Sequence, residues 1–150
     1  MTITEFYLQL KNSFPFDVTL KQDAFLKKIS QFVLNDNQDE IFVLKGYAGT
    51  GKTTLLSVLV NQLPHVNKKY VMLAPTGRAA KVISNYAKQP AFTIHKKIYY
   101  PKKDKNLGMA FTMQANKHKN TVFIVDESSM ISDNVTDATM YTHGSLLDDL

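Results

Sequence analysis

The chain has 150 residues, of which 44% are hydrophobic, no cysteine, and a formal net charge of +5. This length suits one domain with a buried core, and the lack of cysteine excludes disulfides and thiolate metal sites. No apolar run approaches the roughly 20 residues that span a bilayer, and residues 1–14 lack the features of a signal peptide. We therefore expect a cytoplasmic protein with no membrane partner.

The first part of the chain is predicted to be helical. Apolar residues recur at helical spacing over residues 3–14, where Pro15 ends the pattern, and again over residues 20–34. A polar turn at 35–37 separates this segment, residues 1–37, from a second region, residues 38–150. That region opens with an apolar run at 41–44, which we expect to be a buried strand.

A glycine-rich stretch, GYAGTGKTT, follows this run and precedes an apolar segment with helical spacing. Its spacing fits the phosphate-binding P-loop, whose backbone N–H groups form a nest for anions at a helix N-terminus. Lys52 is then expected to reach the β- and γ-phosphates of ATP, and the Thr53 hydroxyl to bind Mg²⁺. A glycine-rich turn with an incidental lysine is the alternative, but the strand–loop–helix context disfavours it. The expected nucleotide contacts of this loop are Gly46, Ala48, Gly49, Thr50, Gly51, Lys52, Thr53 and Thr54.

Strands and helices are expected to alternate after the P-loop. A helix to about residue 63, a strand at 70–74, a helix at 78–88, a short helix at 93–99 and a strand at 122–125 are predicted, with a lysine-rich hairpin within 100–119. This order predicts an α/β fold of three layers with a parallel sheet. Such sheets bind ligands at the carboxyl ends of their strands, where polar clusters occur at 45–53, 75–78 and 126–129.

Two acids, Asp126 and Glu127, directly follow the last predicted strand. Together with a P-loop, Asp126 is expected to hold the Mg²⁺ shell and Glu127 to act as general base toward an attacking water. The pair favours hydrolysis over phosphate transfer to a hydroxyl. Without the P-loop it could equally be a helix cap.

The positive charge is local. Residues 96–119 contain seven lysines and one acid, whereas residues 121–150 contain six acids and no Lys or Arg. A basic stretch of this kind either attracts a polyanion through its phosphates or is a solvated loop. Charge alone favours the solvated loop.

Gln22 lies on the predicted helix, 24 residues before Gly46. A glutamine amide offers a donor and an acceptor, so it can pair with adenine. A plain surface glutamine is an equally good interpretation of the residue alone.

Three further segments, APTGRAAKVIS at 74–84, TIHKKIY at 93–99 and VDESSMIS at 125–132, follow the P-loop in that order. With it, they resemble the first motor domain of superfamily 1 helicases of the RecD-like and Dda-like branch, over roughly residues 18–150. The resemblance implies a RecA-like sheet, and it identifies TLKQDAF with the adenine-reading motif that contains Gln22. It also implies contacts to single-stranded DNA by Pro75, Thr76, Arg78, Thr93 and His95. Taken singly, Thr76 could instead cap a helix, Arg78 could be a surface residue, and His95 could be packed or exposed.

The family pattern continues into a Gly-Asp…Gln motif and a second RecA-like domain with an arginine finger, which this sequence lacks; its one arginine is Arg78. We therefore expect an incomplete RecA-like domain from a longer helicase, which translocates 5′-to-3′ on single-stranded DNA and unwinds duplexes. A second RecA-like domain of the same protein is the expected partner, and this chain by itself should bind ATP with little hydrolysis. The alternatives are a non-helicase P-loop ATPase or kinase, and a nucleotide-binding module that acts by occupancy.

Overall fold

The computed structural model describes residues 1–35, 40–104, 108–131, 146–147 and 149–150. The chain folds into two compact units. The first comprises residues 1–70, 86–88 and 120–122, and the second comprises residues 71–85, 89–119 and 123–150. Among the described residues, no helix has both the length and the apolar character needed to cross a membrane.

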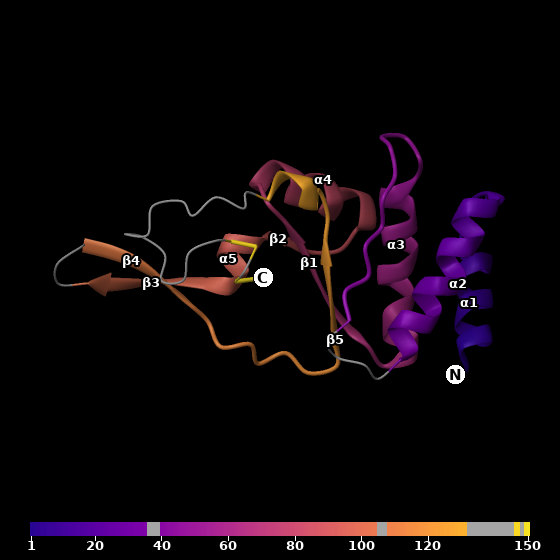
Figure 1. Cartoon of the computed structure of the whole chain (residues 1–150), viewed down its shortest axis with the longest axis horizontal. Helices are drawn as coiled ribbons and strands as arrows, with labels where there is room; N and C mark the ends of the chain where they lie inside the picture. The colour runs from indigo at the N-terminus through magenta and orange to yellow at the C-terminus, as the bar shows by residue number, and fades with distance from the viewer. Residues whose placement is uncertain (36–39, 105–107, 132–145, 148) are drawn as a thin grey trace. The chain divides into compact units, whose positions relative to one another are not determined.

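The first unit is helical (Figure 1). Its helices are α1 (Ile3–Asn12), α2 (Leu20–Leu34) and α3 (Lys52–Gln62), and a 3-10 turn (Leu63–Val66) follows α3. Capping boxes start the first two helices: Thr2 pairs with Glu5, and Thr19 pairs with Gln22. The helix predicted at 20–34 is confirmed, whereas α1 ends two residues earlier than expected, where Ser13 caps it ahead of Pro15.

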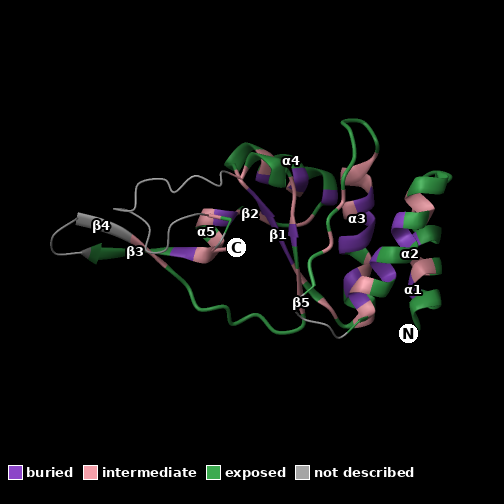
Figure 2. Cartoon of the chain, in the orientation of Figure 1, coloured by how far each residue is buried: buried purple, intermediate pink, exposed green. Residues whose placement is uncertain are grey.

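One face of each helix in this unit is buried (Figure 2). The fully buried apolar side chains of this unit come from all three helices and the turn after α3. They are Phe6, Leu10, Leu26, Val60 and Leu63. Removing this apolar surface from water is the main force that holds the three helices together.

The strand predicted at 41–44 is wrong. Among the described residues, this segment has no regular secondary structure and belongs to no sheet, and Ile41 and Val43 remain 89% and 66% exposed. Phe42 instead packs on α2, with its ring 5.7 Å from that of Phe25 and 5.4 Å from that of Phe32. A β-strand needs a neighbouring strand for its backbone hydrogen bonds. Phe42 makes its aromatic contacts with α2 without such a neighbour.

A three-stranded sheet has the order β2–β1–β5. Its strands are β1 (Lys69–Ala74), β2 (Ala91–Thr93) and β5 (Thr121–Val125), and α4 (Gly77–Ala87) connects β1 to β2. β1 and β2 are parallel, with Met72 opposite Ala91 and Ala74 opposite Thr93. The predicted α/β class with a parallel sheet is confirmed, although β2, which has three residues, was not predicted.

The remaining elements belong to the second unit. The short helix α5 (Ile94–Ile98) follows β2, and the strands β3 (Tyr99–Asp104) and β4 (Gly108–Met113) form an antiparallel hairpin, which confirms the prediction for this stretch. Val71, Leu73 and Ile94 form a small core, against which Ile98 and Val125 pack. The C-terminal acidic segment falls mostly on 132–145, outside the described residues.

Candidate nucleotide-binding loop and sheet edge

The glycine-rich loop of the first unit requires glycine at three of its positions. Gly49 and Gly51 have φ +77° and +82°, the left-handed region in which a side chain is strained. A Cβ at Gly46 would lie 2.9 Å from the Thr50 hydroxyl oxygen. That hydroxyl and the Thr50 backbone N–H both donate to the Tyr47 carbonyl, at 2.8 and 3.4 Å, and close the turn.

Lys52, the expected phosphate ligand, folds back over this loop. Its ammonium donates to the carbonyl oxygens of Gly46 at 2.7 Å and Tyr47 at 2.8 Å. The positive charge is therefore held at the loop itself. Phosphate oxygens accept stronger, charge-assisted hydrogen bonds than carbonyls do, so a triphosphate has the means to draw the ammonium away from them.

The helix that follows the loop begins without a side-chain cap. Gly51 is the N-cap residue of α3, and among the described residues no side-chain cap bonds to the start of this helix. An uncapped N-terminus leaves orphan N–H donors and the positive end of the helix dipole for an anion. Thr53, half-buried in this first turn, carries the hydroxyl expected on Mg²⁺.

The structure brings Gln22 to the P-loop. The Gln22 side-chain oxygen accepts from the Thr19 backbone N–H at 2.9 Å, and its Nε2 donates to the Thr50 carbonyl at 3.4 Å. A Cβ at Gly51 would come within 3.0 Å of that same nitrogen. Because a backbone N–H must face an oxygen, the capping box fixes which end of the amide faces the loop.

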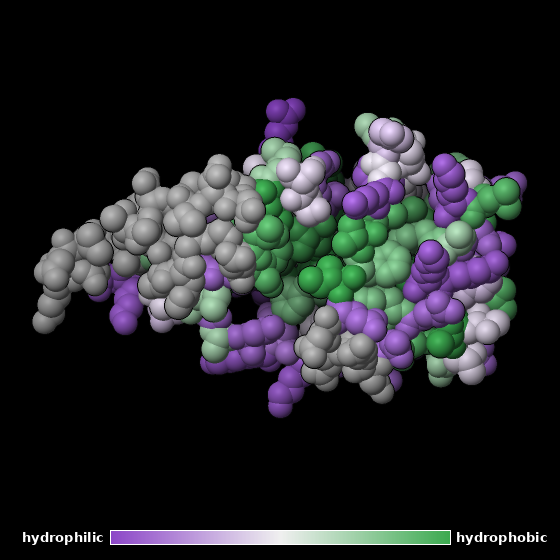
Figure 3. Space-filling view, viewed as in Figure 1, coloured by the Kyte–Doolittle hydropathy of each residue, from purple (hydrophilic) through white to green (hydrophobic). Residues whose placement is uncertain are grey.

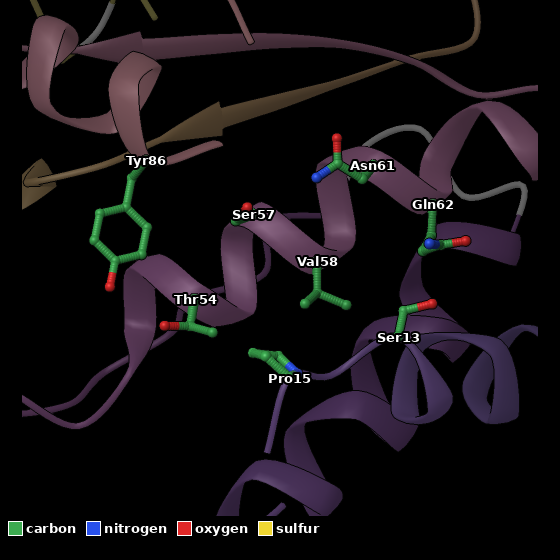
Figure 4. Close-up of a pocket in the computed structure, with 8 residues that line it drawn as sticks. All are labelled: Ser13, Pro15, Thr54, Ser57, Val58, Asn61, Gln62 and Tyr86. Atoms are coloured by element: carbon green, nitrogen blue, oxygen red, sulfur yellow. The ribbon is translucent and has the colours of Figure 1, made fainter. Parts of the chain in front are cut away.

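A cavity of about 320 Å³ lies along α3 (Figure 4). Thr54, Ser57 and Asn61, at helical spacing, line it together with Pro15 and Tyr86. Its lining holds hydroxyl and amide groups but no Lys or Arg. The side chain of Thr54, an expected nucleotide contact, thus faces a neutral cavity, and the cationic group of the P-loop is the Lys52 ammonium.

The carboxyl ends of β1 and β2 lie side by side in the second unit. Ala74 is opposite Thr93, so Pro75 and Thr76 leave the sheet beside the start of α5. The Thr76 hydroxyl accepts from the Ala79 N–H and the Thr93 hydroxyl from the Lys96 N–H, both at 3.2 Å. Both threonines therefore cap helices, as the alternative interpretation of Thr76 expected.

Arg78 and His95 complete this edge. Arg78 is exposed in the first turn of α4. His95 is half-buried on α5 beside the ring of Tyr99, at 5.8 Å, and burial lowers the pKa of its imidazole. Neutral imidazole can donate or accept a hydrogen bond, whereas Arg78 always carries a charge.

The acidic pair lies at the same edge. The Asp126 N–H donates to the Leu73 carbonyl at 3.0 Å, which places the end of β5 beside the end of β1. Glu127 has φ +55°, an uncommon conformation for a residue with a side chain. Its N–H donates to the Asp126 carboxylate at 3.0 Å, and its carbonyl accepts from Met130 at 2.9 Å. These bonds hold the turn that presents the Glu127 side chain.

Sequence reasoning missed Thr19, whose backbone and hydroxyl orient Gln22. The signal was present, because Thr19 and Gln22 have the spacing of a capping box. No group of three or more His, Cys, Asp or Glu that could hold a metal occurs among the described residues. The oxygens of Thr53 and Asp126 are nevertheless of the kind that Mg²⁺ takes in small number beside substrate phosphates.

Comparison with known proteins agrees with this geometry. Residues 26–142 match the model of a family described as AAA domain. An uncharacterized protein of Methanocaldococcus jannaschii is 32% identical over 114 residues, which are 68% of this chain and 10% of that protein. An uncharacterized protein of Acanthamoeba polyphaga mimivirus is 27% identical over 139 residues, which are 78% of this chain and 28% of that protein. The chain thus spans a small part of either relative, and the match over most of its length shows that it belongs to the AAA domain family and is a P-loop nucleotide-binding domain.

Proposed function

We propose that the chain is the ATP-binding motor domain of a superfamily 1 DNA helicase of the RecD-like and Dda-like branch, which moves 5′-to-3′ on single-stranded DNA. Two observations support this. The AAA family that the chain matches is found in superfamily 1 helicase-like proteins. The ordered motifs at 74–84, 93–99 and 125–132 resemble those of the branch.

The observation that carries the proposal is the shared edge of the sheet. Thr76 and Arg78 follow β1, Thr93 is the last residue of β2 and His95 follows it, and the acidic pair follows β5, whose end is bonded to that of β1. The residues proposed to bind single-stranded DNA are therefore neighbours of the proposed hydrolytic base. An edge of this kind can couple hydrolysis of the ATP phosphate to a change in affinity for DNA, as a motor requires.

The nucleotide chemistry divides among few groups. Lys52 and the N–H groups at the start of α3 hold the phosphates, and Gln22 pairs with the adenine base. Thr53 and Asp126 would hold Mg²⁺, which supplies charge neutralisation at the phosphates when it is bound. Glu127 accepts the proton of the attacking water. A second RecA-like domain of the same protein would supply an arginine to the transferred phosphate.

Binding of single-stranded DNA tests the proposal. Fluorescence anisotropy of labelled oligonucleotides across a salt series gives the affinity and its slope, with and without Mg²⁺ and a non-hydrolysable ATP analogue. The Arg78→Ala variant loses one phosphate contact, so the slope of log K against log salt should fall by about 0.7 at every sequence tested. Lys69→Ala, at the opposite end of β1, removes the same charge and should leave the slope unchanged.

Two outcomes count against the helicase. A wild-type chain that binds the ATP analogue but not single-stranded DNA fits a non-helicase ATPase or a nucleotide-binding module. An affinity for single-stranded DNA that is the same with and without the ATP analogue contradicts the coupling that a motor needs.

A further inference from the structure

Helix α1 lies outside every motif of the proposed site. It precedes the span that matches the family model, which begins at residue 26, and Gln22 precedes that span as well. The helix is nevertheless firmly packed, because its Phe6 and Leu10 are fully buried. Hydrophilic side chains cover much of α1 and α2 on the face shown in Figure 3.

A polar cluster joins α1 to the first turns of α2. Asp23, directly after Gln22, accepts from the Tyr7 hydroxyl at 2.6 Å and from the Lys11 ammonium at 2.8 Å, both on α1. Lys27, one turn further along α2, forms an ion pair with the same carboxylate at 2.9 Å. Hydrogen bonds from Lys11, Tyr7 and Lys27, in falling order, hold the pKa of Asp23 well below its usual range.

The same helix also contacts the helix that follows the P-loop. Gln9 on α1 donates through Nε2 to the side-chain oxygen of Gln62 on α3, at 2.6 Å. One helix thus bonds to both α2, which carries Gln22, and α3, which carries Lys52. A movement of α1 would therefore change the position of α2, which carries Gln22, relative to α3, which carries Lys52.

We propose that α1 positions the base-reading residue: Tyr7 and Lys11, acting through Asp23, hold Gln22 against the P-loop and so set the preference for adenine. Tyr7, Lys11 and Asp23 are positioning residues and touch no nucleotide. The inference rests on the base-reading role that the proposed function gives to Gln22.

The hydrogen bonds of Gln22 explain why its position matters. A glutamine amide has two N–H donors and two acceptor positions. In the described structure one acceptor position is used by the Thr19 N–H and one donor by the Thr50 carbonyl. The other donor and acceptor match N7 and the N6 amino group of adenine, whereas guanine presents two acceptors at the same edge.

Neighbouring residues on a helix point about 100° apart, so Asp23 and Gln22 leave α2 in different directions. Anchoring Asp23 to α1 therefore fixes the rotation of the first turns of α2 without blocking Gln22. Loss of the anchor frees this rotation, and a bidentate contact is sensitive to such freedom. The phosphate contacts, which come from the loop and α3, should not depend on it.

The test measures how strongly the chain prefers ATP to GTP. Competition against a fluorescent, ribose-labelled ATP analogue gives the dissociation constants of ATP, GTP and inorganic tripolyphosphate. Gln22→Ala should reduce the ratio of ATP to GTP affinity roughly 5- to 150-fold, as expected for a lost bidentate base contact. The Tyr7→Phe/Lys11→Ala double variant should reduce it about two- to fivefold, because the Lys11–Asp23 contact is exposed and the Tyr7–Asp23 contact is only partly buried. Tripolyphosphate affinity should stay constant in both.

The control is Lys28→Ala, which removes an exposed lysine of α2 and should leave the ratio unchanged. Unfolding midpoints confirm that each variant is folded, and the single Tyr7→Phe variant, which keeps the ring, replaces the double variant if the latter is not. A normal ratio in the folded α1 variants, with a reduced one in Gln22→Ala, overturns the positioning role and spares the proposed function. A normal ratio in Gln22→Ala refutes base reading itself. Equal loss of ATP and tripolyphosphate binding in the α1 variants shows general destabilisation and overturns the inference.

Discussion

The start of α3 at the P-loop and the turns at the edge formed by β1, β2 and β5 use their backbone N–H groups in opposite ways. At the P-loop, α3 begins after a glycine with no side-chain cap. At the sheet edge, each turn is closed by a side chain: Thr76 bonds Ala79, Thr93 bonds Lys96, and Asp126 bonds Glu127. The first turn of α3 therefore keeps its backbone N–H donors for a ligand, whereas the turns at the edge use theirs to fix side chains.

This difference separates two kinds of work. A triphosphate carries several charges and many acceptor oxygens, so a bare helix N-terminus suits it. A hydrolytic base or a strand contact needs a side chain in a set direction, and the capped turns supply that. Variants of the P-loop should therefore change ATP binding, and variants of the edge should change ATP turnover or DNA binding.

Glu127→Gln is expected to have the largest effect. The amide keeps the shape of the side chain but accepts a proton far more weakly, so hydrolysis should fall about 10²- to 10⁴-fold while ATP affinity is retained. Single-turnover hydrolysis of labelled ATP, with the chain in excess, measures the rate even where turnover is slow. Ser129→Ala, two residues on and also exposed, is the control. A rate within about twofold of wild type would assign the base elsewhere.

Lys52→Ala should affect binding instead. The variant loses the ammonium that the Gly46 and Tyr47 carbonyls hold at the loop, and hydrogen bonds to charged groups contribute about 1.5–3 kcal/mol each. Affinity for a non-hydrolysable ATP analogue should fall about 100-fold. Calorimetry compares this variant with Lys45→Ala, which removes an exposed lysine just before the loop. Unchanged affinity in folded Lys52→Ala protein would show that phosphates bind elsewhere.

Local patterns predicted the helices and the P-loop well, because their causes are local. Helix α2 follows from its apolar spacing and from the capping box that starts at Thr19. The same box orients Gln22, so this contact was within reach of sequence reasoning. The hairpin of β3 and β4 also followed from residues close in sequence.

Pairing between distant segments was not predictable in the same way. Residues 41–44 and β1 are similar apolar runs, yet within the part of the chain that the structure describes β1 has strand neighbours and 41–44 has none, and the ring of Phe42 packs on α2 instead. β2 is too short to show a period of two, and its pairing with β1 decides its structure. An apolar pattern in the sequence indicates a preference for β-structure, and an available neighbouring strand determines whether the segment joins a sheet.

The smallest expected effect compares one glycine from each region. Gly51→Ala places a Cβ at φ +82°, which costs about 1–2 kcal/mol for a residue with a side chain. The new Cβ also approaches Gln22 Nε2, the far end of a flexible side chain that can move away. Gly77→Ala, in the first turn of α4, meets no atom within 4 Å and has no positive φ, so it should stabilise the chain by about 0.4–1 kcal/mol. The two midpoints of thermal unfolding should therefore move in opposite directions, by about 2–4 °C per kcal/mol. Gly51→Ala should also weaken adenine preference, because it displaces Gln22, and Gly77→Ala should not. Equal midpoints for the two variants would mean that the P-loop glycine is not held in its left-handed conformation in solution.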